Sequence, residues 1–216
     1  SKLTPLTIPN SVKSIGEQAF YGCKSLTTIN VESGNSIYDS RENCDAIIET
    51  DSNTLILGCQ NTIIPNSVIN IGEGAFFECS NLASITIPSS VTNIGSDAFY
   101  ECSNLTSITI PNSVTEIGHW SFKDCSNLIS IMIPNSVKNM GDSVFYRCDN
   151  LTIYCEAVTQ PYEWNEYWNY SDCPVIWDYK NQDIHICIKE STITIVAPTC
   201  TTEGYDLYTC NECGKE

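Results

Sequence analysis

Cysteines near the C-terminus are the residues whose types and spacing come closest to a defined chemistry. Cys210 and Cys213 form a C-x-x-C pair followed by glycine, and Cys200, Cys187 and His185 lie upstream. Thiolate and imidazole ligands in such a set can hold a tetrahedral zinc ion. A structural zinc ion bound by Cys187 (or His185), Cys200, Cys210 and Cys213 is therefore one interpretation. Disulfides from Cys200 to Cys210 or Cys213, and unpaired thiols, are the alternatives.

Aromatic side chains form a second group with a possible chemistry. The segment 156–180, EAVTQPYEWNEYWNYSDCPVIWDYK, contains three tryptophans and several tyrosines. Trp164 and Trp168 can form a flat platform for sugars, or they can cover the open end of a repeat array. We favour a cap, and Cys155 and Cys173, which bracket the segment, can form a disulfide that staples it.

Catalytic motifs are absent from the sequence. It has two histidines and no G-x-S-x-G elbow, phosphate-binding loop or H-E-x-x-H pair. A cysteine nucleophile needs a base, and none of the recurring cysteines has a histidine at a fixed distance. We therefore predict a protein that is not an enzyme and needs no cofactor other than the possible zinc ion.

These residues are set in a chain that repeats itself. An apolar residue marks the same point in each unit: Ile8, Val31, Ile64, Ile87, Ile110 and Ile133. The step is 23 residues throughout, except for an enlarged unit of 33 between Val31 and Ile64. A period in this range with a Leu-x-x-Ile-x-Ile core predicts a leucine-rich repeat solenoid.

Each fixed letter of the unit has a physical reason. Apolar and polar residues alternate in LTSITIP, which indicates a strand with one buried face, and Pro111 ends that strand. Gly118 permits a tight bend. The residues predicted to be buried together are Leu105, Ile108, Ile110, Val114, Ile117, Phe122 and Cys125. One unit cannot bury this face alone, so stacked units must share a continuous core.

The repeat pattern, as in IPNSVTEIGHWSFKDCSNLISI, resembles the BspA-like leucine-rich repeat of bacterial surface proteins and some protozoan ones, over residues 3–155. The resemblance implies a right-handed, mostly β solenoid with parallel strands on the concave face and turns or short helical segments on the convex side. It also implies export and, in some members, adhesion to host proteins or other cells. Because the sequence begins at Ser1 without a signal peptide, a cell-surface or extracellular location is expected from the resemblance alone.

The enlarged unit departs from the pattern. Two β-rich runs, AIIET and TLILG, flank the turn-forming letters DSN. They predict a β-hairpin over about residues 35–60 that projects outside the stack. If its turn centres on Asp51 and Ser52, Cys44 and Cys59 oppose each other within disulfide reach; free thiols are the alternative.

The domain organisation follows from these patterns. We expect a solenoid over 1–155, an aromatic cap over 156–180 and a small Cys-containing β unit over 181–216. The chain stops three residues after Cys213, which we interpret as truncation of this last unit.

The amino-acid composition excludes some classes of binding partner. With 26 acidic and 10 basic residues the net charge is −16, which disfavours nucleic acid, and no stretch is long and apolar enough for direct membrane insertion. The outward strand positions form a nearly uniform ladder: Ser84, Thr86, Ser107, Thr109, Ser130 and Met132. A second stripe follows each buried aromatic position: Tyr21, Phe77, Tyr100, Lys123 and Tyr146.

We therefore expect a non-enzymatic, exported interaction protein that adheres to a protein on a host or neighbouring cell. The contact is predicted on the irregular hairpin, since loops on rigid scaffolds often carry function. Its residues there are Tyr38, Asp39, Arg41, Glu42 and Asp45. A structural spacer of a larger surface protein and a carbohydrate-binding module that uses Trp164 and Trp168 are the alternatives.

Overall fold

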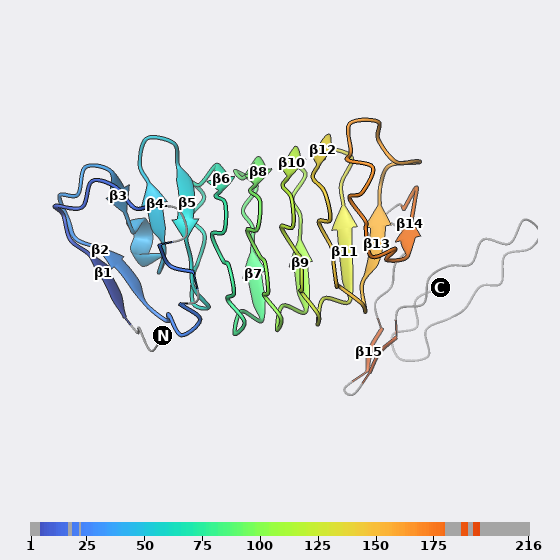
Figure 1. Cartoon of the computed structure of the whole chain (residues 1–216), viewed down its shortest axis with the longest axis horizontal. Helices are drawn as coiled ribbons and strands as arrows, with labels where there is room; N and C mark the ends of the chain where they lie inside the picture. Colours follow the sequence, from blue (N-terminus) through green and yellow to red (C-terminus); the bar gives the residue numbers. More distant parts are fainter. Residues whose placement is uncertain (1–4, 17–18, 22, 180–186, 190–191, 195–216) are drawn as a thin grey trace, which may run out of the picture. The chain divides into compact units, whose positions relative to one another are not determined.

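The computed structural model describes residues 5–16, 19–21 and 23–179, together with two short strands in the tail. The chain divides into two compact units, Ser1–Asp178 and Tyr179–Glu216. In the second unit, β15 (Cys187–Lys189) and β16 (Thr192–Thr194) form an antiparallel pair. The first unit is a stack of rungs whose strands lie side by side (Figure 1).

The predicted strands form the first face of the solenoid. β1 (Leu6–Ile8) pairs in parallel with β2 (Ile29–Val31). After the enlarged unit, five parallel strands follow: β7 (Ser84–Thr86), β9 (Ser107–Thr109), β11 (Ser130–Ile133), β13 (Thr152–Cys155) and β14 (Val175–Ile176). Equivalent residues of successive repeats are register partners: Ile85 pairs with Ile108, and Ile108 pairs with Ile131. The parallel solenoid and its 23-residue frame are thus confirmed.

A second sheet occupies the side for which turns or short helical segments were expected. Its seven strands are β12 (Asn139–Met140), β10 (Glu116–Ile117), β8 (Asn93–Ile94), β6 (Asn70–Ile71), β5 (Thr54–Leu57), β4 (Ile47–Glu49) and β3 (Tyr38–Asp39). Within the described ranges the one helical turn is η1 (Arg41–Asn43).

The predicted core is confirmed. All seven inward residues of the central repeat are buried, from 0 % exposure for Phe122 to 7 % for Ile108. A column of stacked phenylalanines runs through the rungs, with ring centroids 5.1, 5.2 and 5.7 Å apart: Phe76, Phe99, Phe122 and Phe145. The recurring cysteines form a parallel column, in which the Cys125 thiol donates to the Phe99 carbonyl at 3.2 Å. Each of these buried thiols therefore has a hydrogen-bond acceptor in the preceding repeat.

In the regular repeats the glycine that follows the inward Ile or Met has a different role from the one predicted, whereas Gly16 in the first repeat has no such close neighbour. A β-carbon at Gly118 would lie 2.4 Å from the Ser96 nitrogen, and one at Gly141 would lie 2.4 Å from the His119 nitrogen. Glycine is needed because the backbones of neighbouring rungs approach closely, and a tight bend is not the reason.

The hairpin exists, but its predicted place outside the stack is wrong. β4 and β5 pair around a turn with Glu49 opposite Thr54, as a centre at Asp51 and Ser52 requires. β5 then pairs in parallel with β6, so the hairpin extends the second sheet. The reason is apolar burial, because Ile48 and Leu55 are fully buried in the core.

The predicted Cys44–Cys59 disulfide is not formed, and both cysteines are free. A β-bulge between Ile47 and Ile48 shifts the register beyond the paired residues. The Cys59 thiol instead donates to the Asp45 carbonyl at 3.5 Å, and the Cys44 thiol is directed to the Ala46 carbonyl at 3.9 Å.

The aromatic segment closes the end of the solenoid. β14 pairs in parallel with β13, and the Trp168 ring packs edge-on against Phe145 with centroids 6.2 Å apart. The indole nitrogen of Trp164 donates to the Val137 carbonyl at 3.2 Å. Since Trp164 and Trp168 are only 4 % and 3 % exposed, they do not form an open platform for sugars, and that alternative is wrong for these residues.

The predicted Cys155–Cys173 disulfide is also not formed. The Cys173 thiol points to the Cys148 carbonyl at 3.6 Å and so continues the thiol column beyond the last regular repeat. Cys155 is buried in the core at the end of β13. The place of Cys173 at the end of the thiol column explains its burial without a disulfide.

Candidate binding surface

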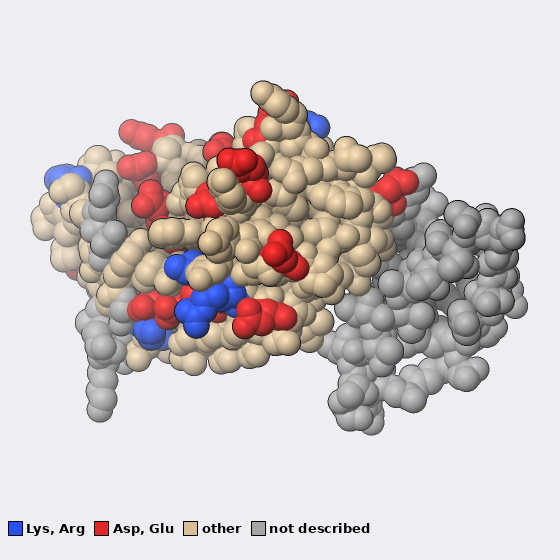
Figure 2. All heavy atoms as spheres, turned by 45° about the vertical axis from the view of Figure 1, so that its right-hand side comes forward, with Lys and Arg blue, Asp and Glu red and all other residues tan. Residues whose placement is uncertain are grey.

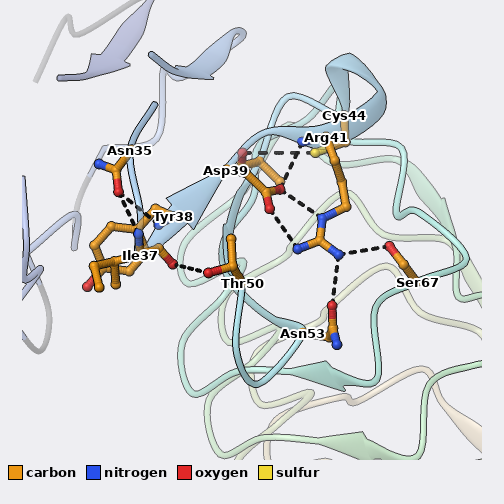
Figure 3. Close-up of polar contacts among 10 residues, drawn as sticks. Asn35, Ile37, Tyr38, Asp39, Arg41, Cys44, Thr50, Asn53 and Ser67 are labelled. Carbon is orange, nitrogen blue, oxygen red and sulfur yellow. Dashed lines mark hydrogen bonds and ion pairs between the residues drawn. The ribbon is translucent and has the colours of Figure 1, made fainter. Parts of the chain in front are cut away.

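Asp39 and Arg41, two of the residues predicted as a contact site in the enlarged unit, bind each other (Figure 3). Arg41 donates through Nε and Nη2 to both carboxylate oxygens of Asp39, at 2.8 and 2.7 Å. Its Nη1 donates to Asn53 at 2.8 Å and to Ser67 at 3.3 Å. The hydrogen bond to Asp39 raises the pKa of Arg41. Arg41 thus clamps β3 to the hairpin turn and to the next repeat.

Two further residues of that set hold neighbouring rungs. Tyr38 is buried, and its hydroxyl accepts a hydrogen bond from the Ile15 nitrogen at 3.2 Å. The Asp45 carboxylate accepts one from the Ile29 nitrogen at 3.2 Å. Glu42 is exposed, with a left-handed φ of 59°. Of the five predicted contact residues, Glu42 presents its side chain most openly to solvent.

The outward strand positions form the uniform polar ladder that the sequence predicts. Ser84, Thr86, Ser107 and Thr109 are exposed, while Ser130 and Met132 are half-buried. Binding hot spots are enriched in Trp, Tyr and Arg, which this ladder does not contain at these positions.

Aromatic side chains gather instead along the second stripe. The aromatic stripe consists of Tyr21, Phe77, Tyr100, Lys123, Tyr146 and Tyr170. Tyr21 stacks on Phe77 with ring centroids 3.8 Å apart, and Phe77 stacks on Tyr100 at 4.6 Å. At the other end Tyr146 meets Tyr170 edge-on at 5.6 Å. The stripe passes directly from Tyr21 to Phe77, although the enlarged unit separates them in sequence.

Lys123 occupies the one stripe position without a ring. Its ammonium nitrogen lies 4.9 Å from the ring centroid of Tyr100, 5.4 Å from that of Tyr146 and 4.6 Å from that of Trp120. Trp120 is 42 % exposed, and its ring is the one nearest to the Lys123 ammonium. The repeat pattern does not mark Trp120, because this residue lies at a variable position of the repeat.

Charged residues flank the aromatic stripe. Lys24 lies 3.5 Å from both Glu78 and Glu101, and Arg147 lies 3.2 Å from Asp124. Basic side chains gather among acidic ones on one part of the face in Figure 2. In a chain of net charge −16, the stripe therefore lies in a locally balanced region.

Among the residues that the structure describes, His119 is the only histidine. His119 is exposed, and its Nδ1 accepts a hydrogen bond from the Asp142 nitrogen at 3.0 Å. Among the described residues no group of three His, Cys, Asp or Glu side chains can hold a metal ion. The predicted zinc ligands Cys200, Cys210 and Cys213 lie outside the described residues, as does the side chain of Cys187.

Comparison with known proteins identifies the repeat. Residues 1–54 and 48–160 match the family described as BspA type leucine rich repeat region, in six copies. The chain belongs to this family. No relative of this BspA-type chain was found among curated proteins.

Two solved structures share the fold of this BspA-type chain. A leucine-rich cell surface protein from Faecalibacterium prausnitzii is 29 % identical, with a TM-score of 0.67 over 83 % of this chain and 49 % of that one. The pneumococcal vaccine antigen PcpA is 23 % identical, with a TM-score of 0.64 over 82 % of this chain and 43 % of its own. The BspA-type chain thus spans less than half the length of either protein.

Proposed function

We propose that the chain is the repeat region of a bacterial cell-surface protein and that it binds another protein through the aromatic stripe. Its location at the surface is supported by the description of the F. prausnitzii relative. Among the described residues, no helix has the length and hydrophobicity of a membrane span. The proposed activity is adhesion without catalysis.

The observation that carries the proposal is the continuous stripe of partly exposed side chains, all of them aromatic except Lys123. An insertion of extra residues separates Tyr21 from Phe77 in sequence, yet their rings stack at 3.8 Å. Tyrosine supplies contact area and a hydroxyl at little entropic cost, so such rows suit protein interfaces. At Tyr170, where the stripe ends, the side chain is 61 % exposed.

The orientation of the rings favours a protein over a sugar as partner. Phe77 packs between Tyr21 and Tyr100, with interplanar angles of 5° and 8°. Both faces of such a ring are covered by its neighbours, so its edge is the part that can reach a partner. A sugar ring that stacks on an aromatic side chain needs an open face.

Adhesion through the stripe can be tested with immobilised chain and a panel of purified host-matrix and bacterial surface proteins. The stripe variant replaces Tyr100 and Tyr170 by serine. One control replaces Thr86 and Thr109 of the polar ladder by aspartate, and another replaces Glu42 by lysine. We expect the stripe variant to lose captured proteins that both controls retain.

Three results would contradict the proposal. Equal capture by all variants would exclude the stripe, provided that circular dichroism and thermal unfolding show each variant folded. Absence of capture by the unmodified chain would favour the spacer alternative, and binding of sugars alone would favour a carbohydrate-binding module.

A further inference from the structure

Trp120 departs from what its backbone position requires. The equivalent residues in neighbouring repeats are Gly74, Asp97 and Ser143, and all four have a left-handed φ between 51° and 59°. Glycine and aspartate tolerate this conformation, whereas a bulky side chain is unusual there. The indole is also 42 % exposed, so it adds little to the core. The fold does not explain a tryptophan at this position.

Lys123 is a second departure in the same repeat. Its equivalents Phe77, Tyr100 and Tyr146 carry rings, and stacking on both neighbours would favour another ring. The ammonium instead lies over the Trp120 ring at 4.6 Å, its nearest ring contact. The two unusual residues of this repeat therefore contact each other. The Lys123 ammonium lies among three aromatic rings, those of Tyr100, Trp120 and Tyr146.

Lys123 interacts electrostatically with Asp97 but forms no ion pair, so its charge is less compensated than that of its basic neighbours. Lys24 has two carboxylates at 3.5 Å, and Arg147 has one at 3.2 Å. Among the residues that the structure describes, no carboxylate lies within 4.0 Å of the Lys123 ammonium. Aromatic faces attract an ammonium but do not accept its hydrogen bonds as a carboxylate does.

We propose that Trp120 and Lys123 form the anchor of the aromatic stripe, where Lys123 binds an Asp or Glu side chain of the partner protein and Trp120 packs against it. This inference rests on the proposed function and specifies the chemistry of its central contact. Tryptophan is among the residues enriched in hot spots, which cluster near the centre of an interface.

The charge of the whole chain selects the kind of partner. A polyanionic polysaccharide would offer carboxylates, but the net charge of −16 repels an extended polyanion. A basic protein surface with an isolated carboxylate is attracted at long range and pairs with Lys123 at short range. The proposed partner is therefore a basic protein segment with a single acidic side chain.

The test uses the whole chain and three defined probes. They are a blocked lysine-rich heptapeptide with one central glutamate, the same peptide with glutamine, and tetragalacturonate. The readout is the indole N–H resonance of Trp120 in a titration followed by ¹⁵N NMR, assigned with Trp120→Phe. The glutamate peptide is expected to bind about two- to fivefold more tightly than the glutamine peptide, as for an exposed ion pair.

Variants then assign the preference to Lys123. Lys123→Gln should abolish the difference between the two peptides, and Lys138→Gln, which removes another exposed lysine, should leave it unchanged. Equal binding of both peptides, no binding of either, or a preserved preference in Lys123→Gln would overturn the inference. Tighter binding of tetragalacturonate than of the glutamate peptide would overturn the choice of a protein partner.

The anchor and the proposed function can fail separately. In the capture assay, Trp120→Asn and Lys123→Gln should lose the proteins that the Tyr100 and Tyr170 variant loses. If those two variants keep the captured proteins while the stripe variant loses them, the anchor is wrong and the stripe stands. If the stripe variant keeps them as well, the proposed function fails.

Discussion

Position 118 leaves no space for a side chain, so only glycine fits there. Gly118→Ala would place a β-carbon 2.4 Å from the Ser96 nitrogen and 2.7 Å from the Gly95 carbonyl carbon. Both atoms belong to the backbone of the neighbouring rung, which cannot shift without disturbing the sheet. We expect the variant to lose about 1–3 kcal/mol of unfolding free energy in urea denaturation, as overpacked cores do.

Gly16→Ala is the matched control for this substitution. A β-carbon there would meet no atom within 4 Å. The control should leave the unfolding free energy within about 0.5 kcal/mol of the unmodified chain. An equal loss in both variants would mean that glycine is required at position 118 for its backbone conformation and not for the close approach of neighbouring repeats.

Trp120 should be a residue that lowers stability. Trp120→Asn places a residue that tolerates a left-handed φ at a position where φ is 53°. The relief of strain should outweigh the lost contact with Lys123, so we expect a gain of about 0.5–1 kcal/mol in urea denaturation. A loss of stability would mean that the indole serves the fold, which would weaken its proposed role in binding.

At this scale the sequence predicts the core well and the surface poorly. Leu105, Ile108 and Phe122 recur at fixed spacing because each must fill the same buried place in every rung. Periodicity marks the stripe position that Lys123 occupies, but Trp120 lies at a variable position of the repeat. The contact between them depends on a loop geometry that the alternation of apolar residues does not specify.

The thiol column should make the solenoid sensitive to alkali. Burial raises the pKa of Cys79 and Cys148 to about 12, and raises the pKa of Cys125 well above its usual value of 9.0. Thiols of the unfolded chain ionise above pH 9, while the folded thiols stay protonated. Stability is therefore fully present below pH 9 and falls as the pH rises from 9 towards 12.

Each buried thiol should contribute up to about 1.4 kcal/mol of lost stability per pH unit in this range. Urea denaturation between pH 8 and 10.5 in the presence of a reductant measures the slope. Cys125→Ala removes one thiol and should reduce the slope by up to that amount, whatever its own effect at pH 8. Identical slopes for the variant and the unmodified chain would contradict the argument.

The aromatic cap should stabilise the last regular repeat of the solenoid. Trp168→Ala removes a ring that is 3 % exposed and packs edge-on against Phe145, so a cavity should form at the end of the phenylalanine column. We expect a loss of about 3–5 kcal/mol, measured by denaturant unfolding. Tyr162→Ala, at a side chain that is 97 % exposed, should cause almost no change.

The enlarged unit shows how far elements can be predicted from sequence. AIIET and TLILG predict two strands, and DSN predicts the turn, which the pairing of Glu49 with Thr54 matches. Their position was predicted wrongly, because the rule of alternation does not say which surface an apolar strand will cover. The full burial of Ile47 and Ile48 required an existing sheet edge, which β6 provides through β5.

Arrangement of the rungs has a mechanical consequence for the whole first unit. Its strands lie across the long direction of the stack, so the backbone hydrogen bonds between rungs point along it (Figure 1). Tension applied along the stack would load the bonds of one rung at a time, as in opening a zipper, instead of shearing all rungs together. Each 23-residue repeat that detaches would release up to about 80 Å of extended chain for roughly 5 Å of stack. Under a steady pull the repeat region would therefore lengthen in steps at low force and would limit the tension passed on to whatever it is attached to.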